Sequence, residues 1–236
     1  MFAAGPQLTR LALALCLAAR VGDVFGDQDR ARKTGAGGAL HAAKEGQKPM
    51  AGWVGWRRGR IERAGFALYN RAVAAGRETF FYETLGVPDT LDGRFDLVGL
   101  HVALLIRRLR HDVAPGPALA QAVFDAMFSD MDVNLRELGV GDLSVGKRVR
   151  AMWEAFHGRA RAYETALDAA DPAALPAALV RNVWRGGETI VIARAARHLA
   201  ALMRAEDSHL ARQGLAALAA GEVNFRGPGP LTGERA

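Results

Sequence analysis

The sequence contains one cysteine, Cys16, few aromatic residues and no run approaching the roughly 18 apolar residues that a membrane-spanning helix needs. A single cysteine excludes an internal disulfide and a thiolate metal cluster. Alternating strand-like patterns are nearly absent, while alanine, leucine and arginine, which are strong helix formers, dominate the composition. A chain of 236 residues is also long enough to bury a substantial core. The sequence therefore predicts an all-α fold.

The net charge of +6 lies almost entirely in the N-terminal quarter of the chain. Residues 1–49 contain seven Lys and Arg against four Asp and Glu, and residues 50–64 contain four against one. The remaining residues contain twenty of each sign, so the body of the protein is neutral. A basic arm of this kind either meets RNA or anionic lipid or is simply solvated, and we expect no DNA binding.

Residues 1–49 are expected to be a poorly ordered extension that precedes the folded domain. Arg10 and the following LALALCLAA are similar to the start of a secretory signal, although no convincing cleavage site follows. The alternative is an upstream start codon, with the protein beginning at Met50. We favour the misassigned start, because residues 35–50 are a featureless polar linker.

Residues 50–236 are predicted to form one helical-bundle domain of about seven to eight helices with a short extended C-terminal tail. The most apolar helix, over residues 95–109, is expected to be capped by Asp92 and to lie at the centre of the bundle. His101 on this helix is expected to be a hydrogen-bonded core residue. The last helix is expected over residues 208–219, followed by a tail that packs back through Val223 and Phe225.

Residues 124–149, FDAMFSDMDVNLRELGVGDLSVGKRV, predict two long helices joined by a tight turn. Apolar side chains recur there at three- and four-residue steps, and Gly139 is expected to end the first helix. Asp132 and Arg136 lie one turn apart in the order that favours a helical ion pair. Lys147 and Arg148 are expected to form a basic surface on the second helix.

Three stretches together resemble a known family: FYETLGVPDTLDGRFDLVGLHVALLIRRLR (residues 81–110), FSDMDVNLRELGVGDLSVGKRV (residues 128–149) and GEVNF (residues 221–225). They are similar, in the same order, to the ubiquinol–cytochrome c chaperone family. Members of that family assist assembly of the cytochrome bc1 complex in mitochondria, and relatives occur in alphaproteobacteria.

The resemblance implies a chaperone without catalytic activity or cofactor, whose client is newly made cytochrome b or another bc1 subunit. It also implies a small co-chaperone and the ribosome as further partners, and a location in the cytoplasm, peripheral to the inner membrane, or on the matrix side in a mitochondrion. The basic and aromatic segment at residues 53–63 suits such a membrane surface. The residues that we expect to bind partners are Arg107, Arg108, Asp132, Arg136, Lys147 and Arg148. For Arg107 and Arg108 this expectation depends on both side chains being exposed at their helix end.

Two nucleotide and metal motifs are incomplete. Residues 141–147 match the first seven positions of a P-loop, but Arg148 stands where Ser or Thr should hold magnesium. Asp130, Asp132 and Asn134 match the start of an EF-hand, but the required glycine and glutamate are missing.

Two alternative functions remain open. The acids of residues 125–134 are also similar to the aspartate-rich helices with which all-α isoprenoid synthases hold magnesium, although no second such helix is present. The other alternative is a generic helical protein-binding module.

Overall fold

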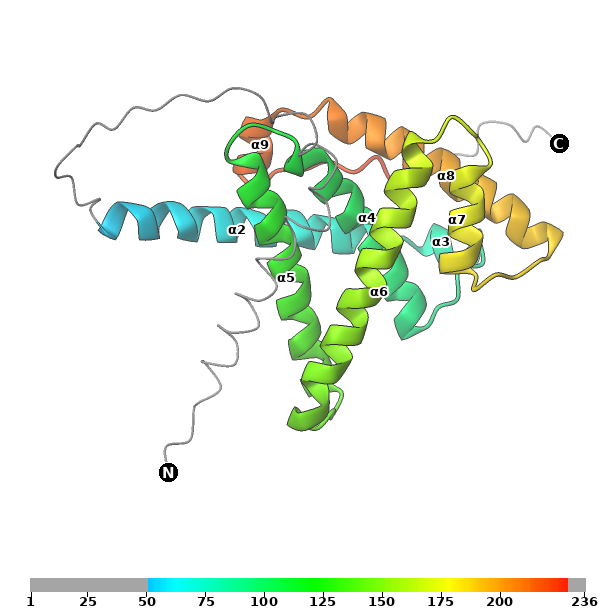
Figure 1. Ribbon diagram of the computed structural model, residues 1–236, viewed down its shortest axis with the longest axis horizontal. Helices are drawn as coiled ribbons and strands as arrows, with labels where there is room; N and C mark the ends of the chain where they lie inside the picture. Colours follow the sequence, from blue (N-terminus) through cyan, green and yellow to red (C-terminus); the bar gives the residue numbers. More distant parts are fainter. Residues whose placement is uncertain (1–50, 229–236) are drawn as a thin grey trace, which may run out of the picture. The chain divides into compact units, whose positions relative to one another are not determined.

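The computed structural model describes residues 51–228, with side chains from Arg58 onward, and these residues form helices with no strand among them. The helices are α2 (Ala51–Gly76), α3 (Thr79–Glu83), α4 (Leu91–Arg110), α5 (Gly116–Glu137), α6 (Asp142–Asp168), α7 (Ala174–Val183), α8 (Ile190–Ala211) and α9 (Leu215–Ala219), shown in Figure 1. The all-α prediction is confirmed. The structure separates into a unit that ends at Arg60 and a unit from Ile61 onward, and the buried core residues among those described lie in the second unit. The predicted extension of residues 1–49 lies outside the described residues.

Helix α4 is the centre of the bundle, as predicted, since it packs against α5, α6, α7 and α8. Its side chains Leu97, Leu100, Leu104, Leu105 and Leu109 are almost completely buried. Each buried leucine contributes roughly 1.5–3 kcal/mol relative to an exposed one. The continuous apolar face of α4 therefore holds the other helices together.

The cap of α4 differs from the prediction. The helix begins at Leu91, and the hydroxyl of Thr90 accepts a hydrogen bond from the Gly93 amide at 3.1 Å. Asp92 lies inside the first turn instead, where its charge still suits the positive end of the helix. The predicted cap was wrong because both residue types cap helices and only the backbone path selects between them.

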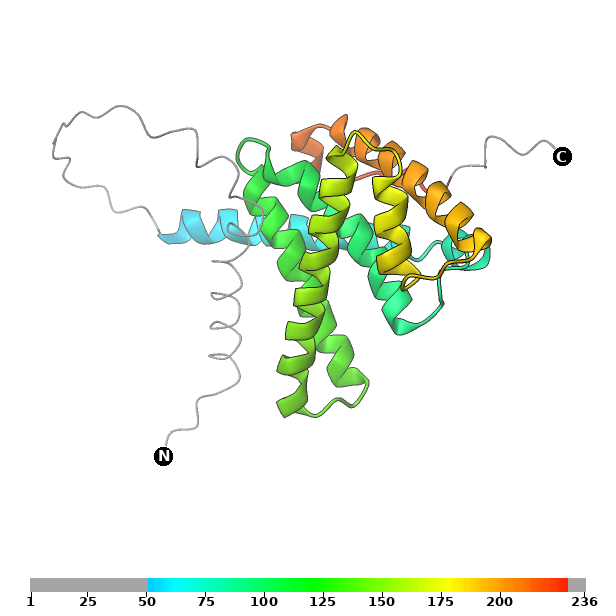
Figure 2. The ribbon, with the colours of Figure 1, turned by 45° about the vertical axis from the view of Figure 1, so that its right-hand side comes forward.

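Helices α5 and α6 are the predicted pair of long helices joined by a tight turn, and both ribbon views show this turn lying away from α7 and α8 (Figures 1 and 2). Gly139 adopts a φ of 78°, a left-handed conformation that costs other residues energy. The Val140 amide donates to the Leu135 carbonyl at 3.1 Å and the Gly139 amide donates to the Arg136 carbonyl at 3.0 Å. These two bonds make a Schellman motif, which satisfies the last carbonyls of α5.

The C-terminal part of the described chain is extended. The predicted last helix over residues 208–219 is wrong, because α8 continues to Ala211 and Gly214 is extended before the short α9. Residues 221–228, which we call the strap, follow α9 without helical structure. Val223 and Phe225 pack against the main core, as predicted.

One cluster of charges is buried inside the bundle. The side chain of Asp96 on α4 is completely buried, with Oδ1 2.5 Å from Nη1 of Arg159 and Oδ2 2.7 Å from Nη2 of Arg185. Arg159 comes from α6, and Arg185 follows α7 with a positive φ of 54°. Burial raises the pKa of Asp96 to about 6, although both guanidinium groups act in the opposite direction.

Candidate functional site

The six residues expected to bind partners fall into two separate groups. Arg107 and Arg108 lie in the last turn of α4, close to the C-terminal end of α6. Asp132 and Arg136 lie in α5 near its end, and Lys147 and Arg148 lie near the start of α6. Because α6 has 27 residues, its two ends are about 40 Å apart. The structure therefore does not bring the six residues into one site.

Arg107 connects three helices. Its guanidinium lies 2.5 Å from Asp168 and 3.3 Å from Glu164, both on α6, and its Nε donates to Asp207 on α8 at 3.2 Å. The hydrogen bond that Arg107 donates to Asp168 raises the pKa of Arg107, and the same interaction lowers the pKa of Asp168. Arg110 also pairs with Glu164. The side chain of Arg107 is only 24% exposed, so the expectation that it is free at the surface is wrong.

Arg108 is tied to the end of α8. Its Nε donates to the Leu210 carbonyl at 3.0 Å, its Nη2 donates to the Gln213 carbonyl at 2.8 Å, and its Nη1 pairs with Asp112 at 2.6 Å. Arg108 therefore donates hydrogen bonds to carbonyls at and just beyond the end of α8, which have no partner within that helix. With 17% of its side chain exposed, Arg108 contradicts the same expectation of exposure.

These two arginines border an open cleft of about 370 Å³ between the ends of α4, α6 and α8. Its other lining residues are His111, Glu164, Asp168, Asp207 and Ala211. The sequence near residue 107 does not predict that Arg107 pairs with Glu164, Asp168 or Asp207, because these acids lie 57 to 100 residues further along the chain. Basic and acidic side chains pair within this cleft, and its clearest role is to fasten α4, α6 and α8 to one another.

The turn between α5 and α6 presents a different surface, which we call the hairpin end (residues 132–148). Arg136 donates to Asp132 at 2.8 Å, as predicted, and also pairs with Asp142 at the start of α6. The guanidinium thereby joins the two helices across their turn. Lys147 and Arg148 are exposed.

Large apolar side chains at the hairpin end are also exposed, and the sequence interpretation missed them. Val133 is 46% exposed, Leu138 64%, and Leu143 is as exposed as in an unfolded peptide. Their neighbours in the repeat, Met131, Leu135 and Val145, are buried. Val133 and Leu143 stand off the apolar stripe of their helices, which is the signal that could have found them. Leu138 was expected on the apolar face with Met131 and Leu135, and it is exposed because it lies just beyond the end of α5 at Glu137. Exposed apolar residues together with basic ones are typical of a surface that binds another molecule.

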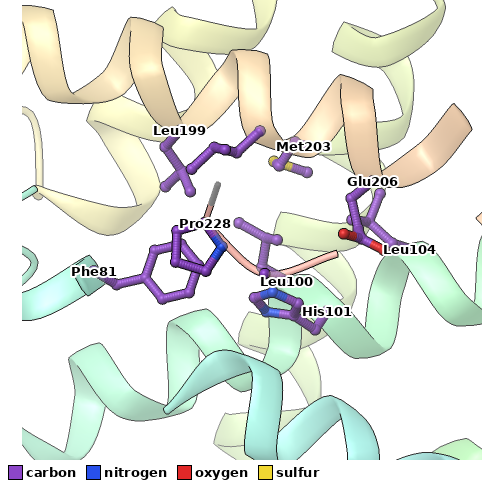
Figure 3. A pocket seen from close by; sticks show the side chains of 10 residues that line it. Phe81, Leu100, His101, Leu104, Leu199, Met203, Glu206 and Pro228 are labelled. Carbon is purple, nitrogen blue, oxygen red and sulfur yellow. The ribbon is translucent and has the colours of Figure 1, made fainter. Parts of the chain in front are cut away.

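A third feature lies between α3, α4 and α8, where the strap covers an apolar groove (Figure 3). The groove is lined by Phe81, Leu100, His101, Leu104, Leu199, Leu202, Met203 and Glu206, with Gly227 and Pro228 of the strap above them. His101 is buried and its Nδ1 donates to the Leu97 carbonyl at 2.8 Å, which confirms it as a hydrogen-bonded core histidine. Burial raises the pKa of Glu206 and lowers that of His101. The sequence interpretation did not single out Glu206.

The acids considered for magnesium have other neighbours. Asp125 accepts a hydrogen bond from Gln121 at 2.7 Å, and Asp130 accepts one from the Tyr69 hydroxyl at 2.7 Å. Among residues 51–228, no three His, Cys, Asp or Glu side chains are grouped so that they could hold a metal ion. The segment of the incomplete P-loop, residues 141–148, was expected to connect the two helices, but the connector is residues 138–141 and residues 142–148 already form the first turns of α6. None of the helices in the described part of the chain combines the length and the apolar character of a membrane span.

The fold and these surfaces define a class of protein: an all-α bundle whose exposed helix ends and covered groove are features on which helical binding domains rely. Comparison with known proteins then specifies the family. The family model described as ubiquinol-cytochrome C chaperone matches residues 83–225. The chain belongs to this family of assembly chaperones, and the resemblance read from the sequence is confirmed.

Two relatives extend the comparison. The chain is 25% identical over 124 residues to ubiquinol-cytochrome-c reductase complex assembly factor 1 of Xenopus laevis, in an alignment that covers 52% of this chain and 62% of that protein. It also matches the crystal structure of the Cbp3 homolog from Brucella abortus at 37% identity and a TM-score of 0.65. That match covers 75% of this chain and 96% of the Brucella chain, so the similarity includes most of the helical body.

Proposed function

We propose that this protein is an assembly factor for the cytochrome bc1 complex that binds newly made cytochrome b until the partner subunits take over. The observation that carries the proposal is the family match, because residues 83–225 run from α3 through the helical bundle into the strap. The similarity to a ubiquinol-cytochrome-c reductase assembly factor supports the same complex as the client. Chaperoning of this kind needs reversible binding of apolar surface and no chemical step.

The hairpin end is the best supported contact surface for such a client. Leu138 and Leu143 present apolar area to solvent, and Lys147 and Arg148 add positive charge beside it. Arg136 keeps the turn in shape through its pairs with Asp132 and Asp142, so the surface is organised before it binds. A preorganised surface loses less entropy on binding.

The protein would work at the cytoplasmic face of the inner membrane, or at the matrix face in a mitochondrion, where a membrane-protein client emerges. The basic segment of residues 53–63, at the beginning of α2, suits a peripheral contact with anionic lipid. A small co-chaperone and the ribosome are the further partners that this role implies.

Deleting the gene tests the assembly role. We expect the deletion strain to lose assembled bc1 complex and spectrally detectable cytochrome b, while unrelated oxidases keep their level. Affinity purification of the protein from growing cells should recover cytochrome b. Normal bc1 levels together with no cytochrome b in the purified fraction would refute the proposal, and a magnesium-dependent diphosphate assay would then test the isoprenoid-synthase alternative.

Substitutions at the hairpin end test the contact surface. We expect the double variant Leu138→Ser/Leu143→Ser to recover several-fold less cytochrome b than the wild type, because it removes exposed apolar area without touching the core. Lys147→Glu/Arg148→Glu should also lower recovery. The matched control is Leu91→Ser, which removes a leucine of similar exposure (62%) from the start of α4. Equal recovery by the hairpin variants and the control would place the contact elsewhere.

A further inference from the structure

The groove beneath the strap contains a polar group that lacks a hydrogen-bonding partner. Glu206 on α8 is only 8% exposed, and its Oε2 accepts a hydrogen bond from the Arg226 amide at 3.0 Å. Its other oxygen, Oε1, is buried and has no hydrogen-bond partner among the described residues. Figure 3 shows this carboxylate directed away from α8 into the space above α4. Leaving a buried acceptor unsatisfied costs roughly 1–3 kcal/mol, and more when the group is charged.

A second acceptor lies in the same groove. Because Nδ1 of His101 donates to the Leu97 carbonyl, the neutral ring leaves Nε2 as an acceptor. The remaining lining is apolar, from Leu100, Leu104 and Met203. A ligand that matches this groove therefore brings apolar surface and one hydrogen-bond donor, and a cationic donor matches a carboxylate best.

The strap fills the groove incompletely. With the strap in place, the remaining cavity has a volume of about 20 Å³, which is room for no more than a water molecule. No side chain of residues 221–228 is fully buried; Val223 and Phe225 are partly buried, whereas Glu222, Asn224 and Arg226 are exposed. The groove itself is well shielded, since Phe81, Leu100 and Leu199 are each at most 3% exposed.

Few polar contacts hold the strap. Gln213 bonds to both backbone groups of Asn224, at 2.6 and 3.0 Å, and Arg226 adds the bond to Glu206. Phe225 adds an edge-on contact with His101. Gly221 and Gly227, near its two ends, have positive φ values of 86° and 68°. A short extended segment with few hydrogen bonds and no fully buried side chain is easier to release than a helix of the core.

We propose that the groove between α4 and α8 is a docking site for an apolar helix carrying one arginine or lysine, and that this helix displaces the strap. The inference rests on the proposed function, since a chaperone for a membrane-protein subunit meets such helices. An apolar helix satisfies its own backbone hydrogen bonds and can lie in a groove lined by leucines. Its cation would pair with Oε1 of Glu206, the acceptor that the strap leaves open. Strap and client then compete, so each weakens the binding of the other.

Peptide binding to the full-length protein tests this. The probe is a fluorescently labelled, water-soluble helical peptide with one apolar face and a single arginine on that face; the matched probe has leucine in place of the arginine. We expect the variant Val223→Ala/Phe225→Ala, which loosens the strap, to bind the arginine peptide about tenfold more tightly than the wild type. Should this variant fail to fold, Gln213→Ala removes two strap hydrogen bonds from outside the groove and should act in the same direction.

Two further readouts separate docking in the groove from binding elsewhere. Glu206→Gln in the loosened variant should abolish the preference for the arginine peptide, whereas Glu188→Gln, at an exposed position, should preserve it. Hydrogen exchange of the Asn224 and Arg226 amides in the wild type should accelerate when the arginine peptide is added, because both amides lose their acceptors.

Three results would overturn the inference: equal binding by wild type and loosened variants, equal binding of the arginine and leucine peptides, or unchanged exchange of the strap amides in the complex. Equal binding of the two peptides would mean that Oε1 of Glu206 does not select a cationic partner. The peptide tests and the gene deletion can fail independently of each other. Normal bc1 levels in a deletion strain would refute the proposed function alone, and failure of the peptide tests would refute the groove alone.

Discussion

A single guanidinium, that of Arg107, joins three helices that are distant in the sequence. Its carboxylate partners lie 57, 61 and 100 residues further along the chain. Basic residues at the end of a helix ordinarily interact with the helix dipole and with solvent. Here Arg107 instead compensates three acids, so removing it would leave Asp168 and Asp207 without this partner, and only Arg110 would remain paired with Glu164.

We expect Arg107→Ala to lower the free energy of unfolding by roughly 1–2 kcal/mol, after allowing for solvent screening at this partly exposed site. Urea denaturation followed by circular dichroism measures the change. The matched control is Arg148→Ala, which removes an exposed arginine from α6 and should change stability by less than about 0.5 kcal/mol. Equal effects of the two substitutions would show that the ion pairs at the end of α4 contribute no stability.

His157 also matters at the scale of one residue. It is 6% exposed among Phe124, Trp153 and Phe156, and burial lowers its pKa to about 4. The folded protein thus takes up this proton at a lower pH than the unfolded chain does, where the pKa of histidine is about 6.5. The stability that neutral His157 contributes is therefore complete above pH 6.5 and is lost as the pH falls towards 4.

We expect His157→Phe to reduce the acid sensitivity of the protein. Between pH 8 and pH 5 the wild type should lose roughly 2 kcal/mol more stability than the variant. A histidine whose pKa is about 6.5 in the unfolded chain and about 4 in the folded protein lowers the free energy of unfolding by this amount at pH 5. Thermal melts of both proteins across this range measure the difference. The comparison at pH 8, where the histidine is neutral in both states, isolates any packing effect of the substitution. A parallel pH dependence of the two proteins would contradict the assignment.

At the scale of the elements, the turn between α5 and α6 depends on one backbone conformation. Gly139 has a φ of 78°, and a Cβ there would meet no other atom within 4 Å. Crowding therefore plays no part, and only the left-handed backbone disfavours other residues.

We expect Gly139→Ala to destabilise the protein by about 1 kcal/mol. Gly146→Ala is the matched control, because Gly146 lies within α6 with equally open space around a Cβ. There alanine should stabilise the helix by roughly 0.5–1 kcal/mol. Effects of opposite sign in denaturation experiments would confirm the role of the turn, and a stabilising Gly139→Ala would exclude it.

At the scale of the whole molecule, the charge distribution divides the chain into a basic N-terminal part and a neutral body. The family match begins at residue 83 and ends at residue 225, within that neutral body. The core that α4 organises is likewise built from residues beyond position 60.

We expect a protein that begins at Met50 to fold as well as the full chain. Its helical circular dichroism should be retained and its melt should stay cooperative, with a midpoint within about 2 °C of that of the full chain. Analytical gel filtration of both proteins provides a second comparison. Aggregation of the shortened protein under conditions in which the full chain is folded would show that residues 1–49 are needed.

Much of this architecture follows from local sequence. The three- and four-residue steps of apolar side chains determine the helices, and Gly139 and Thr189 mark a helix end and a helix start, because such signals act within one or two turns. The ion pair between Asp132 and Arg136 is also local, because the two residues are four positions apart in one helix. The family resemblance likewise came from sequence, since it depends on residue identities in order.

Only the tertiary structure decided what the arginines and the strap do. Arg107 and Arg108 acquire their partners on α6 and α8 because the bundle brings these helix ends together, and no spacing rule connects residues about 100 positions apart. Glu206 is an ordinary helical acid until the strap covers it and leaves one oxygen without a partner. Burial and long-range pairing are properties of the packed chain. They place Arg107 and Arg108, which were expected at the surface, in ion pairs and hydrogen bonds between helices, and they make Glu206 a candidate binding group.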